Sequence, residues 1–161
     1  MRYKDITDKY NNPKKYKIKK QEYYIDDDGN QYNVDNKYVI LNPTIREIEV
    51  AKILGKTLGG IVNIIPRINN PEGIKTPDYI IDNEKYDLKQ INGSGKYVIE
   101  GNLKKKKKQA NNFIIDLTNS KISNEEANRQ IESIYISKRY LWIDKIFIIN
   151  AEKIIRIYKR V

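Results

Sequence analysis

The sequence has no cysteine and no histidine among its 161 residues. Without cysteine the chain can form neither disulfides nor thiolate metal sites, which fits a reducing compartment. The lack of histidine excludes ribonucleases that use histidine as general acid and base, HNH-type nucleases and histidine-based triads. The phosphate-binding pattern Gly-x-x-x-x-Gly-Lys-Ser/Thr is also missing, which excludes an NTPase of that class.

Long apolar segments are missing as well. No run approaches the length of a membrane span, and the N-terminal residues 1–5 lack the apolar core of a signal peptide. We therefore expect a protein without a signal peptide or transmembrane segment that acts in the cytoplasm. Isoleucine-rich runs, such as 113–115 and 146–149, supply apolar strands for one main domain with a real core.

Positive charge exceeds negative charge by ten, and the excess lies almost wholly in one part of the chain. Residues 1–100 contain 17 basic and 15 acidic side chains, whereas residues 101–161 contain 14 and six. The densest element is the lysine run 104–108. Such asymmetry predicts a polyanionic partner, with nucleic acid first. The alternative is a solvated lysine-rich face, since the abundance of Lys, Asn and Ile is typical of an AT-rich genome.

The pattern of apolar residues predicts an α+β or α/β fold, with a mixed central sheet flanked by helices. A helix over 44–58 is indicated by a capping box of Thr44 and Glu47 and by a stop at Gly59-Gly60. The central order is helix–strand–strand–strand–helix–strand. The other expected elements are strand 61–65, a hairpin over 79–89, helix 97–110, strand 112–117, helix 124–137, and strands 143–149 and 153–159.

Residues 1–40 are predicted to form an N-terminal extension, and residues 41–161 a nuclease-like domain. Within the extension we expect a polar arm over 1–20, followed by a small hairpin with its turn at 28–30. Three aspartates at 26–28 suggest part of a calcium loop. The other spaced ligands of such a loop are missing, which argues against calcium.

Two short segments, Thr76-Pro77-Asp78 and Asp87-Leu88-Lys89, carry most of the chemical information. The residues between them predict two strands joined by a tight polar turn around Asn83-Glu84. If Asp82 and Lys85 close that turn, Asp78 lies opposite Lys89 and diagonal to Asp87.

Strand side chains alternate between faces, so Asp78, Asp87 and Lys89 are expected on one face of this hairpin. The opposite face is then apolar and consists of Tyr79, Ile81, Tyr86 and Leu88. Two carboxylates can hold a divalent cation, and a nearby ammonium can stabilise a pentavalent phosphorus centre. This arrangement suits phosphodiester cleavage. The alternatives are a turn aspartate at Asp78 and an exposed strand with alternating charges at 87–89.

Two further residues are candidates for the same site. Glu47 falls on the core side of its helix and could be a third acidic metal ligand, although its capping role explains it equally well. Gln109, at the end of the predicted helix 97–110, could orient a phosphate or a water, or be a plain helix-end amide.

Substrate binding is predicted for two segments. Ser94 and Lys96 lie in a glycine-bracketed loop where backbone amides and a cation could bind a phosphate. In the lysine run, Lys106 is expected to reach toward the site or extend along apolar surface, and the other lysines to contact the nucleic acid backbone. The residues of the run are Lys104, Lys105, Lys106, Lys107 and Lys108.

Four segments together resemble a known family, the C-terminal nuclease toxin domain of CdiA-type contact-dependent inhibition proteins, also found on phage head-associated proteins. The resemblance covers roughly residues 44–160. Its Pro-Asp plus Asp-x-Lys arrangement is similar to the PD-(D/E)xK nucleases. The segments are Gly73–Tyr79, Tyr86–Lys89, Lys108–Asn112 and Ile114–Asp116.

The resemblance implies an RNase that attacks tRNA, together with an immunity protein as partner. A PD-(D/E)xK-like mechanism implies a divalent metal, Mg²⁺ first, held by Asp78, Asp87 and Glu47. Related toxin domains of the barnase/EndoU/colicin/RelE-like class cleave RNA without metal. In that mechanism Lys89, Lys96 and Ser94 would matter more than the carboxylates.

The leading hypothesis from the sequence is a toxin-like endonuclease that acts on RNA. Two alternatives stay open: a metal-dependent DNase with the same residues, and a non-catalytic nucleic-acid-binding module of a phage or mobile element.

Overall fold

The computed structural model describes residues 2–107 and 109–161. Lys108, one of the predicted RNA-binding lysines, lies outside the described residues. The chain forms two compact units, and each is described by itself. The first unit comprises residues 2–11, 87–107 and 111–161, and the second comprises residues 12–86 and 109–110. Neither unit begins at residue 41, the predicted domain boundary.

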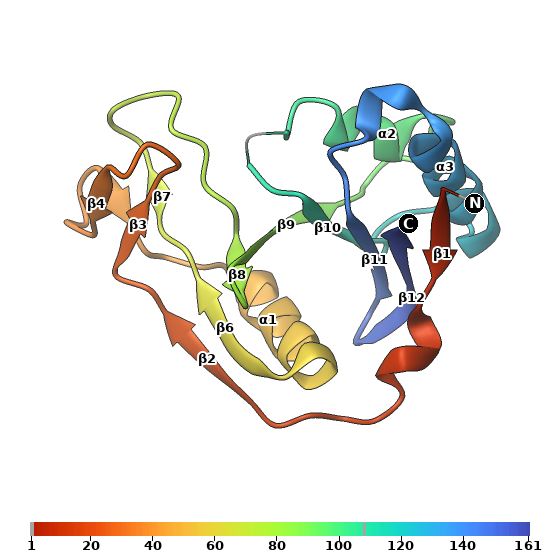
Figure 1. Ribbon diagram of the computed structural model, residues 1–161, viewed down its shortest axis with the longest axis horizontal. Coiled ribbons are helices and arrows are strands. Elements are labelled where there is room, and N and C mark those ends of the chain that lie inside the picture. Colours follow the sequence, from red (N-terminus) through yellow and green to blue (C-terminus); the bar gives the residue numbers. More distant parts are fainter. Residues whose placement is uncertain (1, 108) are drawn as a thin grey trace. The chain divides into compact units, whose positions relative to one another are not determined.

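The first unit contains a mixed set of strands in the order β1–β12–β11–β10 (Figure 1). β10 (Asn112–Asp116) and β11 (Lys145–Asn150) run parallel, whereas β12 (Lys153–Arg160) pairs antiparallel with β11 and with β1 (Tyr3–Asp5). All residues of β10 are buried, which is typical of a strand covered on both faces.

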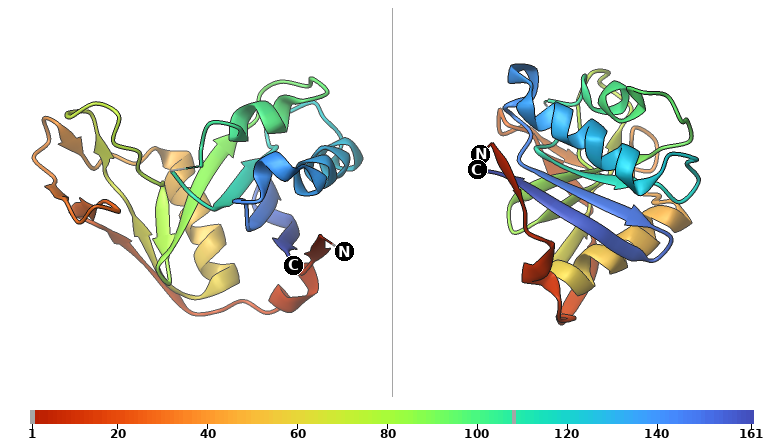
Figure 2. Two further views of the ribbon diagram at one scale, coloured as in Figure 1. Left: turned by 45° about the horizontal axis from the view of Figure 1, so that its top comes forward. Right: turned by 90° about the vertical axis from the view of Figure 1, so that its right-hand side faces the viewer.

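The helices of the first unit are α2 (Val98–Leu103) and α3 (Asn124–Ile136), which lie side by side (Figure 2). Short 3-10 helices occur at Thr7–Tyr10 and Lys138–Tyr140. The prediction of a helix over 97–110 is wrong at its C-terminal end, because α2 stops at Leu103 and the lysines that follow are not helical.

The second unit is built on four neighbouring strands, in the order β2–β6–β8 followed by the start of β9 (Glu84–Gln90). β2 (Tyr16–Lys20) and β6 (Gly60–Ile64) are parallel, and β8 (Tyr79–Ile81) pairs antiparallel with β6 and β9. Two small strand pairs complete the unit. They are β3 (Tyr23–Ile25) with β4 (Gln31–Asn33), and β5 (Val39–Ile40) with β7 (Arg67–Ile68).

Helix α1 (Ile45–Leu58) packs against β2 and β6. The predicted capping box is confirmed: the Thr44 side chain accepts from the N–H of Glu47, and the Glu47 carboxylate accepts from the N–H of Thr44. Gly59 ends the helix with a φ of 75°, a left-handed value that favours glycine. The buried residues Val50, Ala51 and Leu54 form the apolar face of α1.

The mixed sheet with flanking helices is confirmed, but the N-terminal segment differs from the prediction. Residues 1–20, expected to form a polar arm, contribute strand β1 to the first unit and strand β2 to the second. Ile6 is buried. The expected hairpin at 21–40 is confirmed as β3–β4.

The β8–β9 hairpin is confirmed, but its turn lies elsewhere than predicted. Ile81 pairs with Glu84, so the two turn residues are Asp82 and Asn83, with φ values of 50° and 63°. Two-residue hairpin turns favour such left-handed positions, which Asp and Asn tolerate. Tyr79 therefore pairs with Tyr86. The predicted register, in which Asp82 and Lys85 close the turn and Asp78 lies opposite Lys89, is therefore wrong.

A membrane-spanning helix was not expected. None of the helices within residues 2–107 and 109–161 is both long and apolar enough to cross a bilayer.

Candidate active site

Asp87 and Lys89 form an ion pair in the first unit. Lys89 Nζ lies 2.8 Å from Asp87 Oδ2, and the two side chains are 16% and 1% exposed. Alternate residues of a strand project to the same face, so β9 places both groups together. A buried carboxylate is costly unless it is paired, and Lys89 provides that pairing. The predicted common face of these two residues is confirmed.

Asp78 belongs to the second unit, where it directly precedes β8 and is half-buried. Its backbone is fixed on both sides: its N–H donates to the carbonyl of Tyr86 at 3.0 Å, and its carbonyl accepts from the N–H of Ile65 at 3.1 Å. The conformation of the Thr76-Pro77-Asp78 segment is therefore held by the hairpin and by the chain after β6.

Gln109 fixes the same segment. Its Nε2 donates to the carbonyl of Thr76 at 3.0 Å, two residues before Asp78. The residue was expected at a helix end, which is wrong because α2 stops six residues earlier. The structure instead gives its amide a positioning contact in the second unit.

Glu47 is engaged by contacts of its own unit. Its Oε1 lies 2.7 Å from the Arg67 guanidinium and accepts from the N–H of Thr44, while its carbonyl accepts from the Tyr79 hydroxyl at 2.6 Å. These contacts confirm the capping role and tie α1 to β7 and β8. Arg67 was not foreseen from the sequence, because its pairing spans 20 residues.

The loop after β9 contains the predicted phosphate-binding residues Ser94 and Lys96, and all of residues 92–97 are exposed. Tyr97 is 64% exposed, and the Lys96 ammonium lies 5.7 Å from its ring centroid. An exposed hydroxyl, an ammonium and an aromatic ring therefore occur together on one short loop. These groups can contact a phosphate and a base.

Side chains from two other segments hold this loop in place. Ser120 Oγ donates to the carbonyl of Gly93 at 2.9 Å, and the Arg129 guanidinium contacts the carbonyl of Lys96. Gln130, only 4% exposed, accepts from the N–H of Ile99 and donates to the carbonyl of Gly95. The glycine-rich loop is thus fixed by hydrogen bonds.

Sequence reasoning missed Gln130, although it left a signal. It occupies a buried position of α3 together with Ala127, Ile131 and Ile134, and a polar residue in an apolar stripe requires a partner. The neighbouring Arg129 donates to Glu126 and lowers the pKa of that carboxyl to about 2.

The described lysines of the run 104–107 lie in an irregular segment after α2. Lys106 is half-buried and the other three are exposed. The side-chain directions derived for a helix over these lysines therefore do not apply, although their exposure suits backbone contacts with a polyanion.

The acidic side chains do not form the predicted three-carboxylate metal site. Within the described part of the chain there is no group of three or more acidic side chains placed to hold a metal ion. Glu47 does not fit as a ligand, because the guanidinium of Arg67 already occupies its carboxylate and would repel a cation.

Residues 75–154 match the model of the contact-dependent growth inhibition CdiA C-terminal domain. Over this segment, about half of its length, the chain is similar to the CdiA C-terminal domain family. No curated protein matches the sequence. A solved structure, described as a CdiA-CT/CdiI toxin and immunity complex from Burkholderia pseudomallei, is similar at 17% identity. The alignment covers 87% of this chain and 98% of that chain, with a TM-score of 0.46.

The matched segment includes Asp78, the Asp87–Lys89 pair, the loop 92–97 and Gln130. Glu47 and strand β2 lie outside it. The candidate chemistry and the groups that hold the loop thus belong to the segment that defines the family.

Gln130 offers a test of how the loop is held. In Gln130→Leu, the N–H of Ile99 and the carbonyl of the exposed Gly95 lose their partner. The buried N–H of Ile99 has no access to water, and leaving such a group unpaired costs about 1–3 kcal/mol. We expect the free energy of unfolding to fall by about 2 kcal/mol in urea titrations. Glu125→Gln, an exposed change on the same helix, should alter it by less than about 0.5 kcal/mol. Equal effects of the two variants would contradict the assigned role.

Proposed function

We propose that this chain is a nuclease toxin that cleaves RNA, with tRNA as its substrate. The observation that supports it most is the buried ion pair of Asp87 and Lys89 on β9, inside the segment that matches the CdiA C-terminal family. A lysine held by a buried carboxylate is a preorganised positive charge, which suits the stabilisation of a phosphoryl transition state.

Three residues are assigned roles in the proposed reaction. Lys89 stabilises the charge that develops on the phosphate, and Asp87 orients the Lys89 ammonium through the 2.8 Å contact. Asp78 orients the attacking group. Its membership rests on the Pro-Asp plus Asp-x-Lys pattern of the sequence.

Mg²⁺ uses one or two carboxylates and completes its shell with water and phosphate, so Asp78 and Asp87 have suitable donor atoms. Such an ion would have to displace the Lys89 ammonium from Asp87, just as it would have to displace Arg67 from Glu47. It would neutralise the phosphate and polarise a water. Glu47 has no role in the proposed reaction. Ser94, Lys96, Tyr97 and the lysines of 104–107 bind the RNA backbone and a base beside it.

The function is tested by incubating the purified protein with total tRNA and with plasmid DNA, each with Mg²⁺ or with EDTA. We expect tRNA fragments and intact plasmid. Loss of cleavage in EDTA would support a metal held by the two carboxylates, whereas cleavage that survives EDTA would assign the chemistry to Lys89 and the loop. Plasmid cleavage alone would replace the proposal with a DNase. Cleavage of neither substrate would leave a binding module.

The family also supports a partner. We propose that an immunity protein binds this domain and blocks its RNA-cleaving activity. A protein that restores growth of cells expressing the domain, and that forms a complex with it in gel filtration, would meet this expectation.

A further inference from the structure

A second surface of the molecule has features of a nucleic-acid site. It lies entirely in the second unit, on strands β2, β3, β6 and β8, and only its β8 end belongs to the family-matched segment. Residues 14–20 contain five lysines and no acidic residue. Of these seven residues all but Ile18 are exposed.

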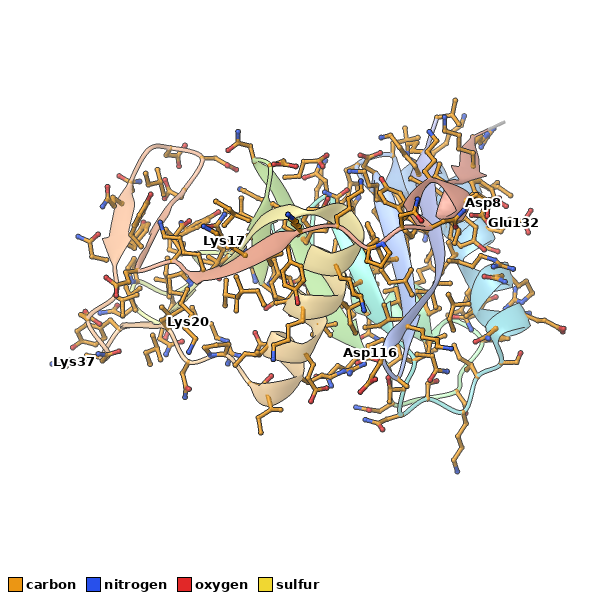
Figure 3. The ribbon with its side chains drawn as sticks, turned by 90° about the horizontal axis from the view of Figure 1, so that it is seen from below. Asp8, Lys17, Lys20, Lys37, Asp116 and Glu132 are labelled. Atoms are coloured by element: carbon orange, nitrogen blue, oxygen red, sulfur yellow. The ribbon has the colours of Figure 1, made fainter. Side chains whose placement is uncertain are left out.

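The strand alternation divides these lysines between two faces. Tyr16 contacts α1 at Gly55, so the even-numbered residues of β2 lie on the helix side. Lys17 and Lys19 therefore lie on the face away from α1. Figure 3 labels Lys17 and Lys20, which leave β2 on opposite sides.

The face away from α1 contains a groove of about 640 Å³. Ile61, Asn63 and Ile80 line it from β6 and β8, and Tyr23 and Ile25 line it from β3. Tyr23 is 41% exposed, and Ile25 and Ile61 are each 48% exposed. The groove therefore offers one aromatic ring and aliphatic side chains to a ligand.

The sheet register places the lysines beside this groove. Lys17 pairs with Ile61, and Lys19 pairs with Asn63, across neighbouring parallel strands. Neighbouring strands lie about 4.8 Å apart. Ile61 and Asn63, which line the groove, thus each have a lysine next to them.

Polar groups inside the groove can recognise a base. The Asn63 amide nitrogen donates to the carbonyl of Ile80 at 3.2 Å, which fixes the amide plane. Gln21 is held in the same way by the carbonyl of Tyr23. The remaining amide oxygens are acceptors at the groove wall.

The acidic residue that lines the groove lies at its end beside the β8–β9 turn. This residue is Asp82. Asp27 is paired with Lys85 at 3.0 Å, so these two charges offset each other. The β2 side, in contrast, is purely cationic, which favours a polyanion that runs along β2.

We propose that this groove binds a single-stranded segment of RNA, with phosphates on Lys17 and Lys19 and a base against Tyr23. Lysines on an edge strand alone would only discourage sheet pairing. Here, however, the lysines lie beside a groove that exposes a tyrosine ring. Proteins that bind single-stranded nucleic acids combine positive charges along the backbone with aromatic rings on which bases stack. The choice of RNA rests on the proposed function.

The test measures binding of a fluorescent 12-nucleotide single-stranded RNA by anisotropy, in a Lys89→Met background that should not cleave it. Lys17→Gln/Lys19→Gln should lower the affinity about tenfold near 0.1 M salt, and the slope of log K against log salt should fall by about 1.4. Tyr23→Ala should weaken binding about fivefold to a hundredfold through lost stacking.

The matched control is Lys20→Gln/Lys56→Gln, which removes the same charge from exposed lysines on the α1 side. It should change the affinity less than threefold. Equal losses of RNA affinity in the two double variants would overturn the proposal. It would also be overturned if polyglutamate displaces the RNA and Tyr23→Ala does not change the affinity. Circular dichroism checks each fold. If Lys17→Gln/Lys19→Gln disrupts strand β2, the proposal is tested by Tyr23→Ala and by crosslinking of 4-thiouridine RNA to Tyr23. Unchanged affinity in Tyr23→Ala together with no crosslink to Tyr23 would overturn it.

This experiment separates the groove from the proposed activity, because binding is measured without turnover. If the variants bind RNA as expected but the unaltered protein cleaves no RNA, the proposed nuclease function is wrong and the proposed RNA-binding groove stands. If the unaltered protein cleaves RNA but the two double variants bind RNA with equal affinity, the nuclease function stands and the proposed groove is wrong.

Discussion

Replacement of Lys89 by methionine is expected to lower the rate of RNA cleavage by at least about 10²–10³-fold, the usual cost of removing one preorganised charge-stabilising group. Methionine keeps the length and apolar stem of lysine and removes only the ammonium. The measurement is single-turnover cleavage of total tRNA, with saturating protein so that binding does not limit the rate.

A loss of stability has to be separated from this loss of activity. The methionine variant leaves Asp87, which is 1% exposed, without its cation, and breaking a buried pair costs about 3–5 kcal/mol. The double variant Asp87→Asn/Lys89→Met removes both charges and should recover much of the unfolding free energy without recovering cleavage. Recovery of both would assign Lys89 a purely structural role.

Lys85→Met is the matched control for this experiment. Lys85 lies on the same strand and is 24% exposed, but its partner Asp27 is 84% exposed. Exposed pairs contribute at most about 1 kcal/mol. This variant should cleave RNA within about twofold of the unaltered protein, and the stated expectation for Lys89 fails if the two methionine variants behave alike.

The hairpin shows which part of the site could be predicted from the sequence. Period-two alternation was sufficient to predict that Asp87 and Lys89 share a face, because only neighbours within one strand are involved. The register was two positions off, because several polar residues lie between the strands. Turn chemistry decides among them: a two-residue turn needs left-handed φ values, which Asp82 and Asn83 adopt.

The end of α2 was missed for an electrostatic reason. Lysine is a good helix former, so the pattern predicted continuation to Ala110. Five consecutive lysines, however, place like charges at the i,i+3 pairs 104/107 and 105/108 and at the i,i+4 pair 104/108. Residues 104–109 also include no apolar side chain that could anchor another turn. Glycine at position 101 weakens the helix further.

Strand β2 shows the opposite case. Tyr16 and Ile18 alternate with lysines, which is a strand pattern, yet the high charge of residues 14–20 suggested a solvated arm. An edge strand tolerates such charge because one of its sides faces no partner strand. Contacts distant in sequence, such as Gln130 with Gly95, leave no pairwise signal in a single sequence.

A double-mutant cycle tests whether Asp78 and Asp87 act on the same phosphate. Asp78→Asn and Asp87→Asn keep side-chain size and remove one charge each, and we expect each to reduce RNA cleavage by about 10²-fold or more. Groups that act as a unit are strongly non-additive. The double variant should therefore be within about threefold of the slower single variant.

Additive losses, near 10⁴-fold for the double variant, would place the two carboxylates in separate tasks and contradict a shared centre. Glu72→Gln, an exposed change six residues before Asp78, should leave the rate unaltered. The Mg²⁺ concentration then separates the two mechanisms. If the carboxylates share a cation, each single variant needs more Mg²⁺ for half-maximal cleavage. If they instead orient Lys89 and the attacking group, the deficit stays constant at every Mg²⁺ concentration, because added metal cannot replace a lost orienting carboxylate.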